Sequence, residues 1–224
     1  MTDADTPLLI IGNKNYSSWS LRAWLLLRVF GVPFRERMLE LDTPEFDAQI
    51  RALSPSGRVP ALHDGDVRLW DSLAIAEYAN ERWLGGRGWP PEPAPRAYAR
   101  AISAEMHAGF TALRVELPMN CTRKRAEAPA LGADAAADVA RVQSIWREAR
   151  ARFGGGGAFL FGAFSIADAM YAPVVLRFVS HAIAFDSAAT RDYAGAIVAL
   201  AALQEWLTDA AAEPQSDIHE RMKP

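Results

Sequence analysis

The pattern of apolar residues changes once along this chain of 224 residues, and the change divides it into two parts. From Leu8 to about Trp83, short apolar runs typical of strands alternate with runs typical of helices. Their order is strand, helix, strand, and then helix, strand, strand, helix. Gly31 is expected to end the first helix, and Gly65 to turn the last two strands into a hairpin. The first part is therefore predicted to be an α/β domain.

A Gly/Pro-rich stretch, residues 85–95, has the composition of a connector between domains. Beyond it, no segment is typical of a strand. Apolar residues recur every three or four positions over 98–117 and 139–153, which predicts helices. Two further helices are expected, from Ile166 to about Phe185 and from Gly195 to about Ala211. The sequence thus predicts an α/β domain over 1–84, a linker over 85–95 and an all-α helical bundle over 96–224.

Composition excludes several classes of protein. The formal net charge of −3 gives no overall basic surface for nucleic acid, and the single cysteine, Cys121, excludes a disulfide within the chain, as is typical of a reducing compartment. The acidic N-terminus lacks the apolar core of a signal peptide, and no apolar run is long enough to span a membrane. His63, His181 and His219 show no ligand spacing, so no metal site is expected. We expect a cytoplasmic protein without nucleic-acid or membrane partners.

Three hydroxyl groups, those of Ser17, Ser18 and Ser20, lie where the first predicted strand passes into the first predicted helix. A serine at a helix start caps free N–H groups, and one serine is enough for that purpose. A hydroxyl at the positive end of a helix dipole can also stabilise an anion. From these residues alone, both interpretations stay open.

Motifs in both parts of the chain carry a resemblance. Val59-Pro60 begins a predicted strand, and Asp71-Ser72 begins the helix after the hairpin. In the second part, Ser165 and Asp168 within FLFGAFSIADAMYAPV are spaced as a reciprocal capping box. Taken together, these motifs resemble the cytosolic glutathione transferases. The resemblance implies an N-terminal thioredoxin-like βαβαββα domain, a helical C-terminal domain, glutathione as co-substrate and a homodimer.

The resemblance also implies a glutathione-binding site. Pro60 is expected to be cis, which would let the main chain of Val59 pair with the tripeptide; the alternative is a trans proline that starts a buried strand. Ser72 and the helix start suit the γ-glutamyl carboxylate, and Asp71, shorter than the Glu or Gln of many relatives, suits the ammonium group. Plain helix capping is compatible with both roles. Arg58 is a candidate for the glycyl carboxylate, or an exposed loop arginine.

The same resemblance implies a role for the hydroxyl groups of Ser17, Ser18 and Ser20. Ser17 and Ser20 have the spacing of the two cysteines of a redox motif, but neither is cysteine, which disfavours thiol transfer. The stretch resembles the SSCS pattern of zeta-like, Ser-type transferases, with Trp19 in place of the cysteine. By that resemblance Ser17 donates a hydrogen bond to the glutathione sulfur and maintains the thiolate. Ser18 is the second choice, and Ser20 is expected to be a cap or a buried packing residue.

An electrophile pocket is expected against the second domain. Ser103, His107, Phe110 and Arg114 fall on one stripe of its first predicted helix, and Tyr16 and Trp19 come from the active loop. Such a wall would suit a small hydrophobic or carboxylated electrophile. The alternative interpretation is that Phe110 belongs to the core and that His107 and Arg114 serve a domain or subunit contact.

The function expected from the sequence is that of a glutathione transferase acting in detoxification. One alternative keeps glutathione and changes the reaction to isomerisation of a diacid, as in maleylacetoacetate isomerase, or to peroxide reduction. Another is a non-catalytic scaffold with this fold. The combination of Ser17, Val59-Pro60 and Asp71-Ser72 disfavours the scaffold, because a protein that does not bind glutathione has no need of all three.

Overall fold

The computed structural model describes residues 6–214. The outermost ends of the two predicted domains, and His219 with them, lie outside the described residues. The first part of the chain forms the predicted elements in the predicted order. They are β1 (Leu8–Gly12), α1 (Ser18–Val29), β2 (Arg35–Leu39), α2 (Pro44–Leu53), β3 (Ala61–Asp64), β4 (Val67–Trp70) and α3 (Ser72–Arg82).

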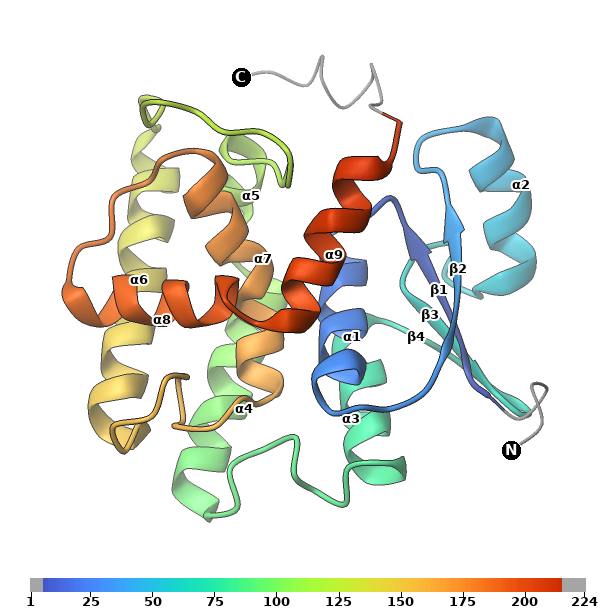
Figure 1. Ribbon diagram of the computed structural model, residues 1–224, viewed down its shortest axis with the longest axis horizontal. Helices are drawn as coiled ribbons and strands as arrows, with labels where there is room; N and C mark the ends of the chain where they lie inside the picture. The colour runs from blue at the N-terminus through green and yellow to red at the C-terminus, as the bar shows by residue number, and fades with distance from the viewer. Residues whose placement is uncertain (1–5, 215–224) are drawn as a thin grey trace.

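The four strands form one mixed sheet in the order β2-β1-β3-β4. β1 runs parallel to β2 and antiparallel to β3, and β3 pairs antiparallel with β4. Side chains of β1 alternate between the two faces: Leu9 and Ile11 join the large core with residues of α1 and α3, whereas Ile10 joins a small core with Ile50 of α2. In Figure 1, α1 and α3 lie between the sheet and the helical part, and α2 covers the other face. The predicted thioredoxin-like domain is confirmed.

The second part is helical, as predicted. Its helices are α4 (Pro93–Ala108), α5 (Thr111–Glu116), α6 (Ala133–Phe153), α7 (Ile166–Ser180), α8 (Ala188–Val198) and α9 (Ala201–Ala212). α7 is almost completely buried and packs against α4 and, across the domain junction, against α1. α9 returns to the first domain and lies beside α1, as Figure 1 shows. Among the described helices, none combines the length and the apolar character needed to cross a membrane.

The run over 98–117 is not the single helix that its spacing predicts. α4 ends at Ala108, and Phe110 adopts a left-handed conformation with φ of 57° before α5 begins. The guanidinium group of Arg114 holds this break, because its Nη2 donates to the carbonyl oxygens of Met106, His107 and Gly109. Apolar residues keep their period across the break because α4 and α5 face the same core, which is why spacing alone missed it.

Two other helix predictions need correction for the same reason. The helix from Ile166 ends at Ser180, short of Phe185. The helix expected from Gly195 onward is two helices, α8 and α9, with a break at residues 199–200. Buried residues on both sides of each break continue into one core, so the apolar pattern does not mark the ends.

The connector between the two parts contacts α3 of the first part. α4 begins at Pro93, inside the predicted linker, and the domain boundaries at 84 and 96 stay predictions. Trp89 of the connector is buried and donates from Nε1 to Glu77 of α3 at 3.0 Å.

The capping box at the start of α7 is confirmed: the Asp168 carboxylate accepts the N–H and the hydroxyl of Ser165, each at 2.8 Å.

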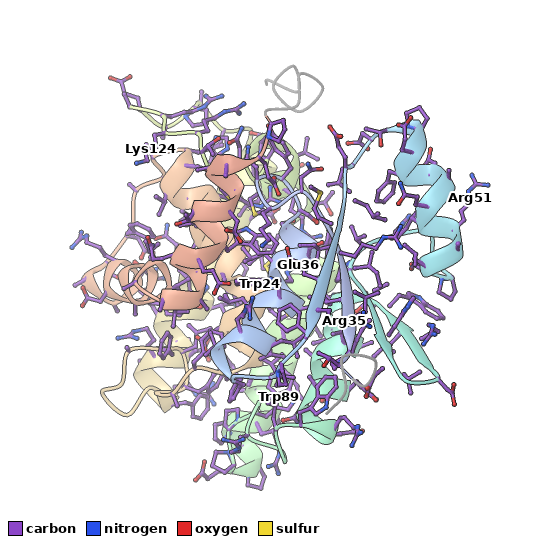
Figure 2. The ribbon with its side chains drawn as sticks, turned by 45° about the vertical axis from the view of Figure 1, so that its right-hand side comes forward. Trp24, Arg35, Glu36, Arg51, Trp89 and Lys124 are labelled. Carbon is purple, nitrogen blue, oxygen red and sulfur yellow. The ribbon has the colours of Figure 1, made fainter. Side chains whose placement is uncertain are left out.

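Helix α1 occupies the junction between sheet and helical part, and this fixes where its N-terminus lies. Figure 2 shows Trp24 of α1 directed toward Glu36 of β2, and Trp24 Nε1 donates to Glu36 Oε2 at 2.6 Å. On its other side α1 packs against α7 and α9. The residues that begin α1, among them Ser17 and Ser18, are therefore held between the two domains.

Candidate active site

A cavity of about 360 Å³ opens beside the start of α3, and we call it the α3 cavity. Its wall comes from the segment before β3, the β4–α3 junction, α1 and α4. The lining residues are Trp19, Ser56, Arg58, Val59, Pro60, Trp70, Asp71, Ser72 and His107. All five residues predicted to bind glutathione are thus brought together, with Trp19 and His107 beside them.

The Val59-Pro60 peptide bond is cis, which confirms the prediction from the sequence. Pro60 is buried, and β3 starts at the next residue. Val59 lies outside the strand, and its main-chain groups make no hydrogen bond within the described part of the chain. These groups are available for strand-like pairing with an extended peptide.

Asp71 and Ser72 combine helix capping with features of a binding site. The Oδ1 atom of Asp71 accepts from the N–H groups of Leu73 and Ala74, at 2.9 and 3.2 Å, and its Oδ2 pairs with His107 Nε2 at 3.0 Å. Asp71 also has φ of 77°, a strained value for a residue with a side chain, of the kind found at functional sites. The Ser72 hydroxyl is buried and has no hydrogen-bond partner in the described structure.

The three hydroxyls at the start of α1 have different surroundings. Ser17 is the N-cap of α1: its Oγ accepts from Ser20 N at 3.4 Å and donates to Ser20 Oγ at 2.7 Å. Ser20 is fully buried and also accepts from Gly12 N at 3.0 Å, so it is not the cap but a buried polar contact. Ser18 Oγ accepts from Arg177 Nη2 at 3.2 Å. Ser17 and Ser18 are buried, and neither lines the α3 cavity.

A second, smaller cavity of about 150 Å³ lies at the junction of the domains, and we call it the arginine cavity. It is lined by Tyr16, Leu41, Arg114, Pro118, Met119, Asn120, Arg123 and Arg177. Trp19 connects it to the α3 cavity, because its ring lies 4.8 Å from the guanidinium carbon of Arg114.

Positive charge is concentrated around this second cavity. Arg22 is buried with its guanidinium carbon 4.1 Å from the Trp19 ring, and its Nε and Nη1 have no hydrogen-bond partner. Burial, followed by repulsion from Arg114 and Arg177, lowers the pKa of Arg22 to about 9, and burial followed by Arg114 lowers the pKa of Arg177 to about 10. Within the described residues, none of these three arginines forms an ion pair. An anion would offset the cost of burying them together.

The five residues predicted for the electrophile pocket are divided by the structure. Tyr16 and Arg114 line the arginine cavity, whereas Trp19 and His107 line the α3 cavity. Phe110 is buried in the core at the break before α5, as the alternative interpretation held. The proposed stripe of one helix does not exist, because these residues lie on either side of that break.

Sequence reasoning missed several lining residues. Trp70 directly precedes Asp71-Ser72, and Ser56 lies three residues before Val59, so both could have been included with these motifs. Arg177 is a lone charge inside the apolar run YAPVVLRFVS, and a charge in a buried helix is a recognisable signal of a site. Arg123 belongs to the basic run RKR, which has no such distinguishing context. Cys121 lines neither cavity, and burial raises the pKa of its thiol to about 12.

Comparisons with known proteins agree with this geometry. Residues 16–82 match the family model described as Glutathione S-transferase, N-terminal domain. The chain is 38% identical over 60 residues to dichloromethane dehalogenase of Methylorubrum extorquens, covering 26% of this chain and 21% of that protein. It is 32% identical over 108 residues to a probable maleylacetoacetate isomerase of Caenorhabditis elegans, covering 48% and 49% respectively. The chain thus spans half or less of the length of these curated relatives.

Among solved structures, a glutathione transferase homologue from Burkholderia BGR1 with bound glutathione superposes with a TM-score of 0.70. The two are 21% identical, and the match covers 93% of this chain and 99% of that one. The fold and the α3 cavity define a two-domain protein with a thioredoxin-like domain and a helical domain. Residues 16–82 thus belong to the glutathione S-transferase N-terminal domain family, and the whole chain has the fold of a glutathione transferase, so the resemblance drawn from the sequence is confirmed.

Proposed function

We propose that this protein is a glutathione transferase that ionises the thiol of bound glutathione for attack on a small electrophile. One observation carries the proposal: the buried, unpartnered hydroxyl of Ser72 lies at the N-terminus of α3, in the wall of the α3 cavity. A buried hydroxyl without a partner costs free energy until a ligand supplies one. The γ-glutamyl carboxylate would supply it, and the dipole of α3 favours the negative charge.

The other groups of the α3 cavity suit the rest of the tripeptide. The carboxylate of Asp71 suits the γ-glutamyl ammonium, which would share it with His107. The free main-chain groups of Val59 suit the cysteinyl unit. Arg58 is exposed at the edge of the cavity, where its guanidinium group can meet the glycyl carboxylate.

Thiol activation is assigned to Ser17. Ser17 precedes α1, and the second residue of that helix, Trp19, lines the α3 cavity. Ser17 and Ser20 share a hydrogen bond between two hydroxyls, so Ser20 can become the donor and leave the Ser17 proton for the sulfur. The S–H proton leaves to solvent, and the thiolate accepts a hydrogen bond from Ser17. The sulfur then forms a bond to a carbon of the electrophile. In a substitution the leaving group departs with the electron pair of the broken bond, and in an addition a π bond breaks and the carbanion takes a proton from solvent.

Replacement of Ser72 tests the binding part of this proposal. Ser72→Ala removes the hydroxyl expected on the carboxylate, and a hydrogen bond to a charged group contributes about 1.5–3 kcal/mol. Glutathione affinity, measured by titration calorimetry, should therefore fall about ten- to a hundredfold. Ser103→Ala is the matched control, because Ser103 is also buried and unpartnered but lies outside the α3 cavity.

The control should bind glutathione like the parent. Equal affinity of the parent and Ser72→Ala would leave Ser72 without a role in binding. A parent protein that binds no glutathione would favour the scaffold alternative.

A second candidate reaction is isomerisation of a carboxylated substrate, and the arginine cavity favours it. Arg114, Arg123 and Arg177 line that cavity, and buried Arg22 lies close by. Guanidinium groups suit carboxylates in geometry and in charge. In this reaction the thiolate adds to a double bond of the diacid, rotation follows, and the thiolate leaves again.

The assembly and location expected from the family remain proposals. We propose a homodimer, and the exposed apolar side chains of the edge strand β4 support it: Trp70 is 43% and Val67 38% exposed. We also propose a cytoplasmic location, which the single, unpaired Cys121 supports.

A further inference from the structure

Lys14 is a buried cation in the loop between β1 and α1, and two carboxylates hold it. Its Nζ lies 2.6 Å from Asp209 Oδ2 of α9 and 2.9 Å from Glu36 Oε1 of β2. The rings of Trp24 and Trp206 face the same ammonium group at 5.1 and 5.5 Å. Burial alone would lower the pKa of Lys14, but the hydrogen bonds to Asp209 and Glu36 outweigh it and raise the pKa. Lys14 therefore stays charged and ties the loop to α9.

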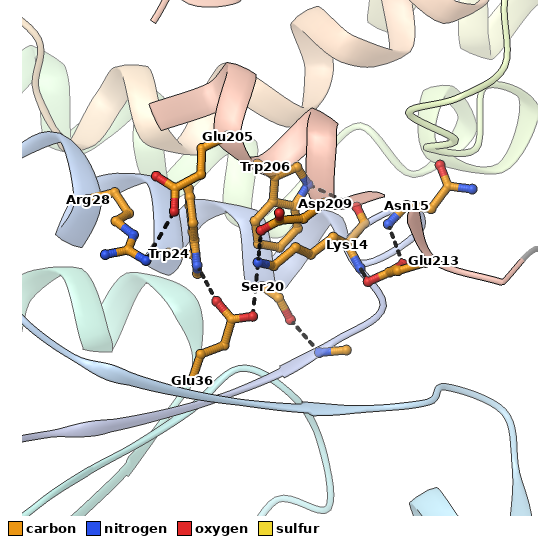
Figure 3. A network of polar contacts seen from close by, with 11 residues as sticks. Lys14, Asn15, Ser20, Trp24, Arg28, Glu36, Glu205, Trp206, Asp209 and Glu213 are labelled. Carbon is orange, nitrogen blue, oxygen red and sulfur yellow. Dashed lines mark hydrogen bonds and ion pairs between the residues drawn. The ribbon is translucent and has the colours of Figure 1, made fainter. Parts of the chain in front are cut away.

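The end of α9 also holds the main chain of this loop. Glu213, just beyond α9, accepts Lys14 N with Oε1 at 2.7 Å and Asn15 N with Oε2 at 3.1 Å. Trp206 of α9 donates from Nε1 to the carbonyl oxygen of Lys14 at 2.9 Å. Figure 3 shows these contacts side by side, with both oxygens of Glu213 directed at consecutive amides of the loop.

The loop that Glu213 holds leads directly into Ser17. Asn13 O accepts the N–H groups of Tyr16 and Ser17, at 3.2 and 2.8 Å, so this turn determines where the Ser17 hydroxyl begins α1. Asn15 O in turn accepts from Cys121 N at 3.2 Å. The two hydrogen bonds of Glu213 thus end on Lys14 and Asn15, within three residues of Ser17, and neither partner lines the α3 cavity.

We propose that Glu213 is a positioning residue for the thiol-activating hydroxyl, so that the C-terminal helix α9 sets the geometry of Ser17. This inference rests on the proposed role of Ser17. The carboxylate of Glu213 gives the consecutive N–H groups of Lys14 and Asn15 one rigid acceptor. Loss of that acceptor frees the turn that places the Ser17 hydroxyl. Small displacements of a catalytic group change rates strongly while leaving the binding of distant parts of the substrate intact.

The experiment compares Glu213→Ala and Glu213→Gln with the parent and with Glu205→Ala as control. Glu205 lies on the same helix and pairs with Arg28 of α1 at 3.1 Å, far along α1 from the loop. Three quantities are measured: hydrogen exchange of the amides of residues 14–17, the pKa of the bound glutathione thiol by ultraviolet absorbance, and kcat with KM for glutathione.

In Glu213→Ala we expect faster exchange of these amides, a rise of about one unit in the thiol pKa and a fall of about tenfold in kcat, with KM for glutathione within about twofold. Glu213→Gln keeps one acceptor oxygen for the loop and should recover part of each change. Glu205→Ala should match the parent in all three.

Equal exchange over residues 14–17 in Glu213→Ala and Glu205→Ala would overturn the inference, and so would faster exchange with an unchanged thiol pKa. Exchange is measured without glutathione, so it reports on the loop even if the parent fails to ionise the thiol. That failure would be seen in the parent itself and would remove the proposed function and this inference with it.

Discussion

The α3 cavity and the arginine cavity lie next to each other and are built in opposite ways. Most of the α3 cavity comes from one stretch, residues 56–72. The groups proposed to bind glutathione there are main-chain atoms, a helix N-terminus and the polar side chains of Arg58, Asp71 and Ser72. The arginine cavity draws residues from four separate segments of both domains. Its character comes from arginine side chains that the fold brings together.

Under the proposed function, this difference separates recognition of glutathione, in the α3 cavity, from recognition of the electrophile, in the arginine cavity. The geometry of the α3 cavity depends mainly on residues that are close in the chain. A cavity assembled across the domain junction changes whenever the packing of α1, α5 and α7 changes. We therefore expect substitutions in the two cavities to affect different kinetic constants.

The largest effect is expected from Arg177→Met, with an anionic electrophile. The substitution keeps a long side chain but removes the guanidinium group that lines the arginine cavity and donates to Ser18. If that group meets a carboxylate, kcat/KM for a carboxylated electrophile should fall about ten- to a hundredfold. For an uncharged electrophile it should change less than about threefold.

Arg191→Met controls for the loss of one positive charge, because Arg191 is exposed on α8, outside the arginine cavity. Steady-state kinetics with both electrophiles supply the comparison. An equal loss of kcat/KM toward both electrophiles would mean that the arginine cavity does not distinguish charged from uncharged electrophiles. The structural contrast between the two cavities would then not extend to function.

A smaller effect is expected from Ser20→Ala, which sharpens the distinction among the three hydroxyls. Its hydroxyl is fully buried and accepts from Gly12 N and from Ser17, so removal leaves a buried N–H without a partner. The free energy of unfolding should fall by about 1–3 kcal/mol in urea denaturation, while glutathione affinity stays within about twofold. Parent-like stability with lost activity would instead place Ser20 in the chemistry.

The order of strands and helices in the first part and the start of α3 at Ser72 could be predicted because they depend on residues close in the chain. The cis Pro60 and the residues of the α3 cavity were predicted from the resemblance to glutathione transferases. What the sequence could not give was set by packing. The break at Phe110 is hidden because α4 and α5 share one core, and Arg177 meets Ser18 only through the contact of α1 with α7.

The same limit applies to the loop before α1. Glu213 and Asn15 are 198 residues apart, and no pattern in the chain relates them. No sequence pattern singles out Lys14, yet the structure buries it with its ammonium group facing two tryptophan rings.

The pKa of the bound glutathione thiol tests the central claim most directly. An ultraviolet titration should give a thiol pKa below that of free glutathione in the parent. In Ser17→Ala the loss of a hydrogen bond to the thiolate, about 1.5–3 kcal/mol, should raise that pKa by about one to two units. Ser18→Ala should titrate like the parent. If the thiol titrates at its free value in the parent, or Ser18→Ala raises the pKa while Ser17→Ala does not, the account of Ser17 is contradicted.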